Sequence, residues 1–217
     1  MKEWNLFPTI AAPMPYQMAL DELLFKKYFL DSSSSQKPLL RFFYASEPSV
    51  TVGFSYRGFD SKDPAICRRI TGGGKVEHGK DLIFSLIARK DHDESFKSVR
   101  ISYWKIHEAI RAGFALYERD FQFYRCDEEL PKGSECFHFP IATDLAYQKK
   151  KIAGGAQKRS GGAMLHEESI QRPGNMEDES MEEAVRKGFE KIFEIEWIPC
   201  HVRPEDLKAA YALSKSK

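Results

Sequence analysis

The sequence lacks several features that would assign it at once to a large class of proteins. Its 33 lysines and arginines are balanced by 32 aspartates and glutamates, so it has no basic excess of the kind that marks proteins coating nucleic acid or anionic membranes. No stretch approaches the roughly 20 consecutive apolar residues of a membrane-spanning helix. The opening residues MKEWNLFPTIAAP contain no continuous apolar segment of a signal peptide. We therefore expect a cytoplasmic protein that binds neither nucleic acid nor a membrane.

Closely spaced cysteines are missing as well. Of the four cysteines, at positions 67, 126, 136 and 200, no two form a CxxC pair. This spacing excludes a zinc knuckle and a thioredoxin-type motif, and we expect reduced thiols and no metal site.

The apolar pattern predicts a single α+β domain over residues 1–217. Apolar residues at helical spacing predict helices over about 15–30, 98–120, 179–193 and from Pro204 onward. The buried stripe of the second helix is expected to comprise Ile101, Trp104, Ile110, Phe114 and Tyr117. Strand-like runs lie at 39–45, 49–55, 66–71, 82–88, 121–125, 143–148, 151–158, 162–166 and 194–200. Because residues 82–88 are almost wholly apolar, they are expected at the centre of a mixed, mainly antiparallel sheet flanked by helices.

Three consecutive glycines, Gly72, Gly73 and Gly74, stand out in RRITGGGKVEH. Glycine loses the most backbone freedom on folding, so such a run is expected where the backbone passes a ligand or needs a positive φ. Arg68 and Arg69 before the run, with Lys75 and His78 after it, suit a carboxylate or phosphate held by backbone N–H groups and a guanidinium. The run is neither a Walker A loop nor a dinucleotide-binding GxGxxG motif. A flexible hairpin tip with solvated charges is an equally good interpretation.

The stretch KKKIAGGAQKR, residues 149–159, combines basic residues with two glycines. Lys151 begins a strand of little side-chain bulk and is suited to lie against a bound group as a point charge. Lys149 and Lys150 are expected in a solvated turn. With the net charge balanced, a nucleic-acid patch is a weak alternative.

Cys136, in GSECFHFP, is the cysteine with a setting suited to reactivity. By default a cysteine at the start of an aromatic run is a buried small hydrophobic residue. The polar loop before it and the lysine-rich strand after it favour a thiolate instead, with His138 as a minor candidate partner. His166 follows a second glycine pair and either lines the same pocket or ends a strand.

The order and spacing of these segments resemble the catalytic domain shared by lipoate–protein ligases, octanoyltransferases and, more distantly, biotin–protein ligases. QMALDELL (17–24) is similar to the family's MAxDE helix, and RRITGGG to its RRxTGGG motif. Asp144 followed by KIAGGA (151–156) is similar to its D-L…K-[IV]-[AS]-G-x-A motif. The resemblance covers nearly the whole chain.

The resemblance implies the fold of class II synthetases and biotin ligases and a tunnel for an acyl chain. Lys151 would sit beside the acyl carbonyl, where an ammonium stabilises developing negative charge. In one branch of the family a cysteine accepts octanoate as a thioester, and Cys136 is the matching residue here. The residues expected to bind substrate are Arg69, Thr71, Gly72, Gly73, Gly74, His78, Asp144, Gly154, Ala156 and His166.

The activity implied first is transfer of an octanoyl or lipoyl group to a lysine of a lipoyl domain. The donor would be octanoyl-acyl carrier protein, and the acceptors the lipoyl domains of 2-oxoacid dehydrogenases or the glycine cleavage H protein. This route needs no cofactor. The alternative is a lipoate–protein ligase that uses ATP and Mg²⁺, with Lys151 at the adenylate and Cys136 merely structural. A non-catalytic acyl-binding or lipoyl-domain-binding protein is the third. We expect no accessory C-terminal domain of the kind that long ligases carry.

The chain departs from the family pattern in one notable place. Where the family continues L-H-x-G-[ST], this sequence has His166 followed by Glu167, Glu168 and Ser169. Two carboxylates at this position would repel an anionic adenylate if they faced inward. Tyr56 and Lys75 also replace typical family residues.

Overall fold

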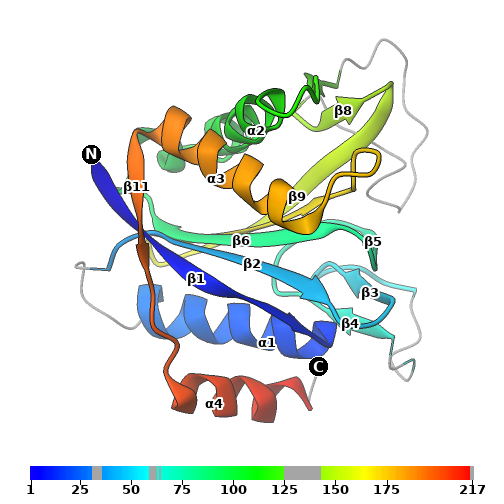
Figure 1. Ribbon diagram of the computed structural model, residues 1–217. Helices are drawn as coiled ribbons and strands as arrows, with labels where there is room; N and C mark the ends of the chain where they lie inside the picture. The colour runs from blue at the N-terminus through cyan, green and yellow to red at the C-terminus, as the bar shows by residue number, and fades with distance from the viewer. Residues whose placement is uncertain (31–35, 59–62, 64, 125–142, 216–217) are drawn as a thin grey trace.

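Two sheets and four α-helices form the part of the chain that the computed structural model describes, residues 1–30, 36–58, 63, 65–124 and 143–215. The larger sheet has the order β11-β1-β2-β6-β10-β9-β8-β7, and the smaller one has the order β4-β3-β5. Helices α1 and α4 cover one face of the large sheet, and α2 and α3 cover the other (Figure 1). None of the described helices is long and apolar enough to cross a membrane.

The strands and helices have the following bounds. The strands of the large sheet are β1 (Lys2–Ala12), β2 (Leu39–Ala45), β6 (Leu82–Arg89), β7 (Gln122–Phe123), β8 (Leu145–Tyr147), β9 (Lys150–Ser160), β10 (Ala163–Ile170) and β11 (Ile195–Pro199). Those of the small sheet are β3 (Ser49–Val52), β4 (Ile66–Arg68) and β5 (Lys75–His78). The α-helices are α1 (Met14–Phe25), α2 (Val99–Ala115), α3 (Asp178–Phe193) and α4 (Pro204–Ser214). A π-helical segment, Lys26–Leu30, continues α1, and a 3₁₀ turn, Glu94–Lys97, precedes α2.

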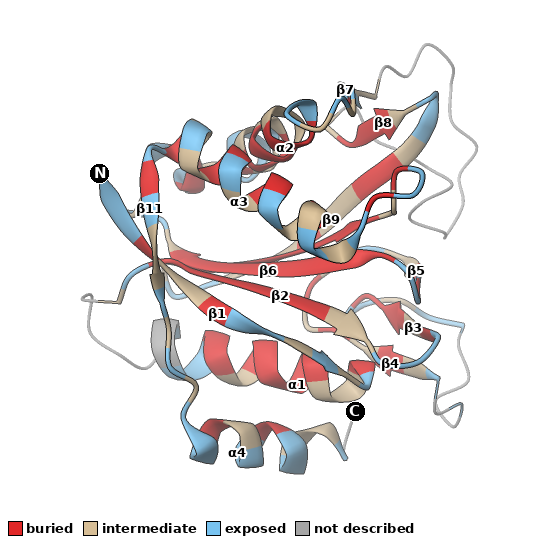
Figure 2. Cartoon of the chain, in the orientation of Figure 1, coloured by how far each residue is buried: buried red, intermediate tan, exposed pale blue. Residues whose placement is uncertain are grey.

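Strand β6 lies at the centre of the large sheet, as its apolar sequence predicts. Seven of its eight residues are buried, and the strand is coloured as buried along nearly its whole length in Figure 2. Phe84 and Leu86 join the core under α2 and α3, whereas Ile87 faces the core under α1. Antiparallel pairing joins β2 to β6, β6 to β10 and β10 to β9, while β1 pairs in parallel with both β2 and β11. The prediction of a mixed, mainly antiparallel α+β fold is confirmed.

The buried stripe of α2 differs from the expected one. Ile101 and Trp104 are each about half exposed, at 52% and 51%, whereas Ile110 and Phe114 are buried as predicted. The rotation of α2 is set by its crossing with α3, because a Cβ on Gly113 would overlap the backbone carbonyl of Ala184. Small residues must face the partner helix at such a close crossing, and this turns the larger residues near the start of α2 outward.

Other differences concern the ends of strands. Strand β1 was not predicted; its Pro8 lacks a backbone N–H and lies at a shift in register between Phe7 and Ile10. The strand expected at 49–55 ends at Val52, where a turn closed by Tyr56 N–H and the Gly53 carbonyl begins, and that expected at 66–71 ends at Arg68, ahead of the glycine run. The strand expected at 162–166 continues to Ile170, so the two glutamates lie within β10 and not in a turn.

Candidate active site

One pocket is lined by five of the predicted site residues, Arg69, His78, Lys151, Gly154 and Ala156, whereas Thr71, Gly72, Gly73, Gly74, Asp144 and His166 are not part of its lining. It lies where α1, the small sheet and the strands β6, β9 and β10 meet. Its apolar wall consists of Met14, Met18, Val76, Ile83 and Ala156. Its polar side chains include Thr51, Arg69, His78, Lys151, Glu167 and Ser169. An apolar body with a few convergent polar groups is typical of a small-molecule site.

Lys151 is held at this pocket by an ion pair. Its Nζ lies 2.7 Å from Oδ2 of Asp144, and each of the two side chains is only 5% exposed. Lys149 and Lys150, by contrast, are exposed. Space for the buried ammonium exists because residue 154 is glycine, since a Cβ there would lie 2.7 Å from the Nζ of Lys151. Lys151 therefore places a buried, ion-paired ammonium next to the apolar surface of the pocket.

The triple-glycine run wraps around the guanidinium of Arg69. The Nε and Nη2 atoms of Arg69 donate to the carbonyl of Gly72 at 3.1 and 2.8 Å, and Nη2 also donates to Gly74 at 2.9 Å. Gly73 has a φ of 87°, a conformation that favours glycine. A Cβ on Gly53 would overlap the carbonyl of Gly73. The carbonyls of Gly72 and Gly74 thus accept from Arg69 and fix it in the pocket wall, whereas the expectation that the N–H groups of the glycines hold an anionic ligand stays a prediction.

A chain of hydrogen bonds runs behind Arg69. Nη1 of Arg69 donates to Thr51 Oγ1 at 3.0 Å, and this hydroxyl lies 2.8 Å from Nε2 of His78. His78 Nδ1 lies 2.7 Å from Oδ2 of Asp81, which also accepts from the Ser169 hydroxyl at 2.6 Å. Burial acts to raise the pKa of Asp81, but the hydrogen bond and charge of His78 outweigh it and lower the pKa. This series of hydrogen bonds holds His78 in one orientation at the pocket.

Sequence reasoning missed Thr51, Asp81 and Ser169. Asp81 lies three residues after His78, which is a signal visible in the sequence. Thr51 and Ser169 come from other strands and have no local signature.

Thr71 and Glu167 form a second buried pair at the pocket. The Thr71 hydroxyl donates to Oε2 of Glu167, while Oε1 of Glu167 is buried and has no hydrogen-bond partner among the described residues. Burial, reinforced by the charge of Asp21, raises the pKa of Glu167 to about 7, although Thr71 and two arginines oppose the shift. Near neutral pH this carboxyl is therefore present in both protonation states.

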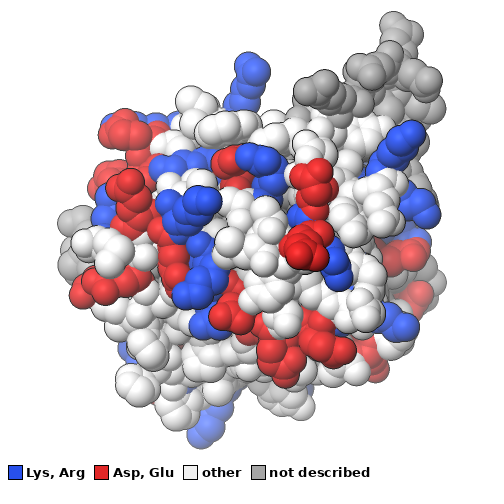
Figure 3. Space-filling model, turned by 45° about the horizontal axis from the view of Figure 1, so that its top comes forward, with Lys and Arg blue, Asp and Glu red and all other residues white. Residues whose placement is uncertain are grey.

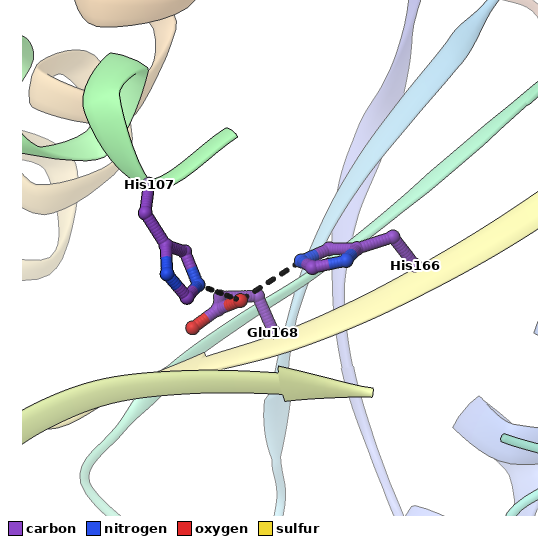
Figure 4. Close-up of side chains that lie close together, drawn as sticks. All are labelled: His107, His166 and Glu168. Atoms are coloured by element: carbon purple, nitrogen blue, oxygen red, sulfur yellow. Dashed lines mark hydrogen bonds and ion pairs between the residues drawn. The ribbon is translucent and has the colours of Figure 1, made fainter. Parts of the chain in front are cut away.

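Glu168 turns to the opposite side of the sheet, where it joins His107 of α2 and His166 (Figure 4). Its Oε2 accepts hydrogen bonds from Nε2 of His107 at 3.0 Å and from Nε2 of His166 at 2.8 Å. His166 does not line the pocket, so the structure gives no support to the expectation that it binds substrate. Because strand residues alternate between the two faces, His166 and Glu168 share the face opposite to Glu167.

The hydrogen bonds of this cluster decide its protonation. His107 donates from Nδ1 to the carbonyl of Thr143 and from Nε2 to Glu168, so it is a cation. The Gln157 amide lies 3.1 Å from Nδ1 of His166, which leaves the single proton of that ring on Nε2. One potential metal-ligand atom from each of His107, His166 and Glu168 lies within 4.8 Å of the other two, close enough for a divalent cation. Instead, both imidazole rings donate their Nε2–H to the Glu168 carboxylate, which forms a buried ion pair with His107.

The expected nucleophile, Cys136, lies outside the described residues, as do Cys126 and His138. Among the described residues, Cys67 is buried beside Met14 and Ile83, and Cys200 is partly exposed. Burial raises the pKa of the Cys200 thiol, which disfavours the thiolate at that position. The described chain resumes after Cys136 at Thr143, next to Asp144 of the site.

Comparison with solved structures defines the class of fold. A lipoate-protein ligase A bound with ATP superimposes with a TM-score of 0.74 at 19% identity, covering 100% of this chain and 96% of that one. The bipartite lipoate protein ligase from Thermoplasma acidophilum gives a TM-score of 0.73 at 18% identity, covering 100% of this chain and 94% of that one. At these identities the likeness concerns the fold alone, and it confirms the predicted ligase-type architecture.

Sequence comparison gives the family. Residues 13–205 match the family model of the lipoyl protein ligase A/B catalytic domain, so the chain belongs to this family. The octanoyltransferase LipM of Geobacillus kaustophilus is 30% identical over 184 residues, which cover 77% of this chain and 64% of that protein. The matched region thus spans somewhat less than two thirds of that relative. The family resemblance drawn from the motifs is confirmed.

Proposed function

We propose that this protein is an octanoyltransferase that passes a medium-chain acyl group from a carrier thioester to a lysine of a lipoyl domain. The observation that carries the proposal is the buried Lys151–Asp144 pair at the head of a largely apolar pocket. An ammonium fixed in a water-poor site stabilises negative charge on a carbonyl oxygen far better than it does in water. The name of the LipM relative supports transfer of octanoate in particular.

In the proposed reaction Cys136 carries the acyl group. Its thiolate attacks the carbonyl of octanoyl-acyl carrier protein, a new thioester forms as the C–S bond to the carrier breaks, and the carrier thiolate takes up the proton that the Cys136 thiol lost. The amine of the acceptor lysine then attacks this second thioester. The amide bond forms, the C–S bond breaks and the thiol of Cys136 is restored. Lys151 stabilises the oxyanion in both steps and is not consumed.

The expected acceptors are lipoyl domains of 2-oxoacid dehydrogenases or the glycine cleavage H protein. In support, the solved Thermoplasma acidophilum system pairs a ligase of this fold with its E2 lipoyl domain. The route needs no cofactor and is expected to operate in the cytoplasm. An ATP- and Mg²⁺-dependent ligase is the alternative, because Arg69 and Lys151 are two cations in one pocket that would suit the phosphate of an adenylate.

The intact mass of the protein after mixing with octanoyl-acyl carrier protein, without ATP, tests the proposal. We expect the addition of one octanoyl group that hydroxylamine removes and that Cys136→Ser abolishes. Cys200→Ser, at a partly exposed cysteine, should acylate normally. If no adduct forms and lipoate is attached to a lipoyl domain only when ATP is added, the ligase is correct and the transferase is wrong.

The lysine has its own matched pair of variants. Lys151→Met should slow acyl transfer by about 10²-fold or more, the usual effect of removing one oxyanion-stabilising group. Lys150→Met, at the exposed neighbouring position, should transfer at the rate of the unmodified protein. Equal rates for the two variants would remove Lys151 from the mechanism.

A further inference from the structure

Glu167 remains without a role in the proposed transfer, although it lines the acyl pocket. The pocket around it includes apolar side chains such as Met18, Ile83 and Ala156. One carboxyl oxygen is satisfied by Thr71, and the other, Oε1, is buried without a partner among the described residues. A buried polar atom without a hydrogen bond is destabilising and needs an explanation. A plain alkyl chain in this pocket could not form a hydrogen bond with Oε1.

The register of the sheet locates Glu167 along the pocket. Ser169 pairs with Gly154, whose missing Cβ leaves space for the Nζ of Lys151, and Glu167 pairs with Ala156. Two residues along a strand correspond to roughly 7 Å. The carboxyl of Glu167 therefore lies about 7 Å beyond the level of the ammonium that is proposed to face the acyl carbonyl.

The protonation of Glu167 restricts the group that would satisfy it. Its charged neighbours are Asp21 on α1, Arg41 on β2 and Arg69 beside the glycine loop, and its pKa lies at about 7. An ammonium would suit only the ionised carboxylate, and an ether or ketone only the protonated acid. A hydroxyl both donates and accepts, so it suits both forms.

We propose that Glu167 makes the pocket selective for a medium-chain acyl group that carries a hydroxyl partway along or at the end of the chain. The inference rests on the proposed function in assuming that the acyl chain occupies this pocket with its carbonyl at Lys151. On this account the departure from the family pattern at Glu167 determines substrate choice, and Glu168, on the other face of the sheet, stabilises the fold.

Equilibrium binding of free acids by calorimetry tests the selectivity without requiring transfer. The probes are octanoate, terminally hydroxylated octanoate and octanoate hydroxylated in mid-chain. We expect at least one hydroxylated acid to bind about tenfold more tightly than octanoate, since losing one such hydrogen bond to a buried group has this size of effect. Glu167→Leu should reverse the order, and Glu167→Gln should retain it.

Ser169→Ala is the matched control, because Ser169 lies two residues away on the same face of β10 and nearer to Lys151. It should change the affinities for all three acids by a common factor and leave their ratio intact. Octanoate binding as tightly as both hydroxylated acids, or an unchanged ratio in Glu167→Leu, would overturn the inference. So would the absence of binding by all three acids. Failure of the proposed transferase is recognised separately, by the missing thioester adduct.

Discussion

Glu167 and Glu168 are neighbours in the chain and have opposite electrostatic properties. For Glu168, burial favours the neutral acid, but the charge of His107 and hydrogen bonds from both imidazoles outweigh it and lower the pKa to about 2. The same carboxylate acts in the opposite direction on His107 and raises its pKa. Among the described residues no ion pair to Glu167 is formed, and burial raises its pKa to about 7. Glu168 is therefore part of a stabilising ion pair, whereas ionised Glu167 is a destabilising buried charge at the pocket.

Glu168→Gln should destabilise the fold. A folded pKa of about 2 against a reference of 4.5 means that Glu168 stabilises the protein above pH 4.5, and that this stabilisation disappears as the pH falls towards 2. The shift corresponds to roughly 3 kcal/mol. We expect urea unfolding at pH 7 to show a loss of roughly 3 kcal/mol or more, because His107 is left as a buried charge. A variant as stable as the original protein would show that the pair contributes no net stability.

Glu167→Gln should have the opposite effect. Because the folded pKa of this acid is raised, from 4.5 to about 7, ionisation destabilises the protein progressively between these two pH values. The variant should therefore gain up to roughly 3 kcal/mol relative to the original protein at pH 8, and little at pH 4.5. Urea unfolding across this pH range measures the difference. Glu77→Gln, at an exposed position of β5, should show no such trend.

At the scale of elements, two adjacent glycines of β9 face the pocket on one side of the sheet and the His107–His166–Glu168 cluster on the other. Gly154 faces the pocket and makes room for Lys151, whereas Gly155 faces α2 and makes room for Glu168 and His166. The alternation of a strand thus assigns one glycine to the site and the other to the core. The helix pair α2–α3 uses glycine similarly, since Gly113 and Gly188 allow the two backbones to touch.

Alanine at these two glycines should separate activity from stability. In Gly154→Ala the new Cβ meets the flexible end of Lys151, at 2.5 Å from Cε, so we expect slower acyl transfer and a stability change below about 1 kcal/mol. In Gly155→Ala it overlaps the Glu168 carboxylate and lies 2.6 Å from Cε1 of His166, which should destabilise the fold by about 2 kcal/mol. Thermal unfolding and transfer rates distinguish them. Gly79→Ala, with open space around it, is the control.

At the scale of the whole molecule, the two ends of the described chain are joined in one sheet. Strand β1 pairs with β2 on one side and with β11 on the other. Beyond β11, Ala210 of α4 joins the core that includes Leu20 and Leu24 of α1. Lysines and arginines are interspersed with acidic residues on the face seen in Figure 3, in keeping with the balanced net charge.

Removal of residues 194–217 should therefore destabilise the pocket, although none of the described residues among them lines it. The deletion uncovers one edge of β1 and the outer face of α1, which supplies Met14 and Met18 to the pocket. We expect a loss of several kcal/mol out of the ~5–15 kcal/mol typical of a domain, seen as a lower melting temperature and weaker binding of acyl chains. An unaltered melting temperature in this deletion would contradict this account.

Much of the fold follows from local patterns in the sequence. The apolar run of β6 and the helical spacing of α3 predicted those elements within a residue or two of their bounds, and the start of α4 was predicted at Pro204, where it lies. The prediction failed where the outcome depends on contacts between elements. The prediction for the α2 stripe was wrong at Ile101 and Trp104, because a close crossing with α3 sets the rotation of the helix. Strand β1 was missed because its pairing depends on strands from both ends of the chain.

The sequence by itself determined the family, the order of the elements and the importance of the segments around Arg69 and Lys151, because these are local motifs with characteristic spacing. Only the tertiary structure decided that the two glutamates lie within β10, on opposite faces of the sheet, and that the Glu168 carboxyl, not that of Glu167, pairs with His107 and His166. It also joined Thr51 to His78 and Glu168 to His107. Strand order and register set those contacts, and residues far apart in the chain carry no local trace of them.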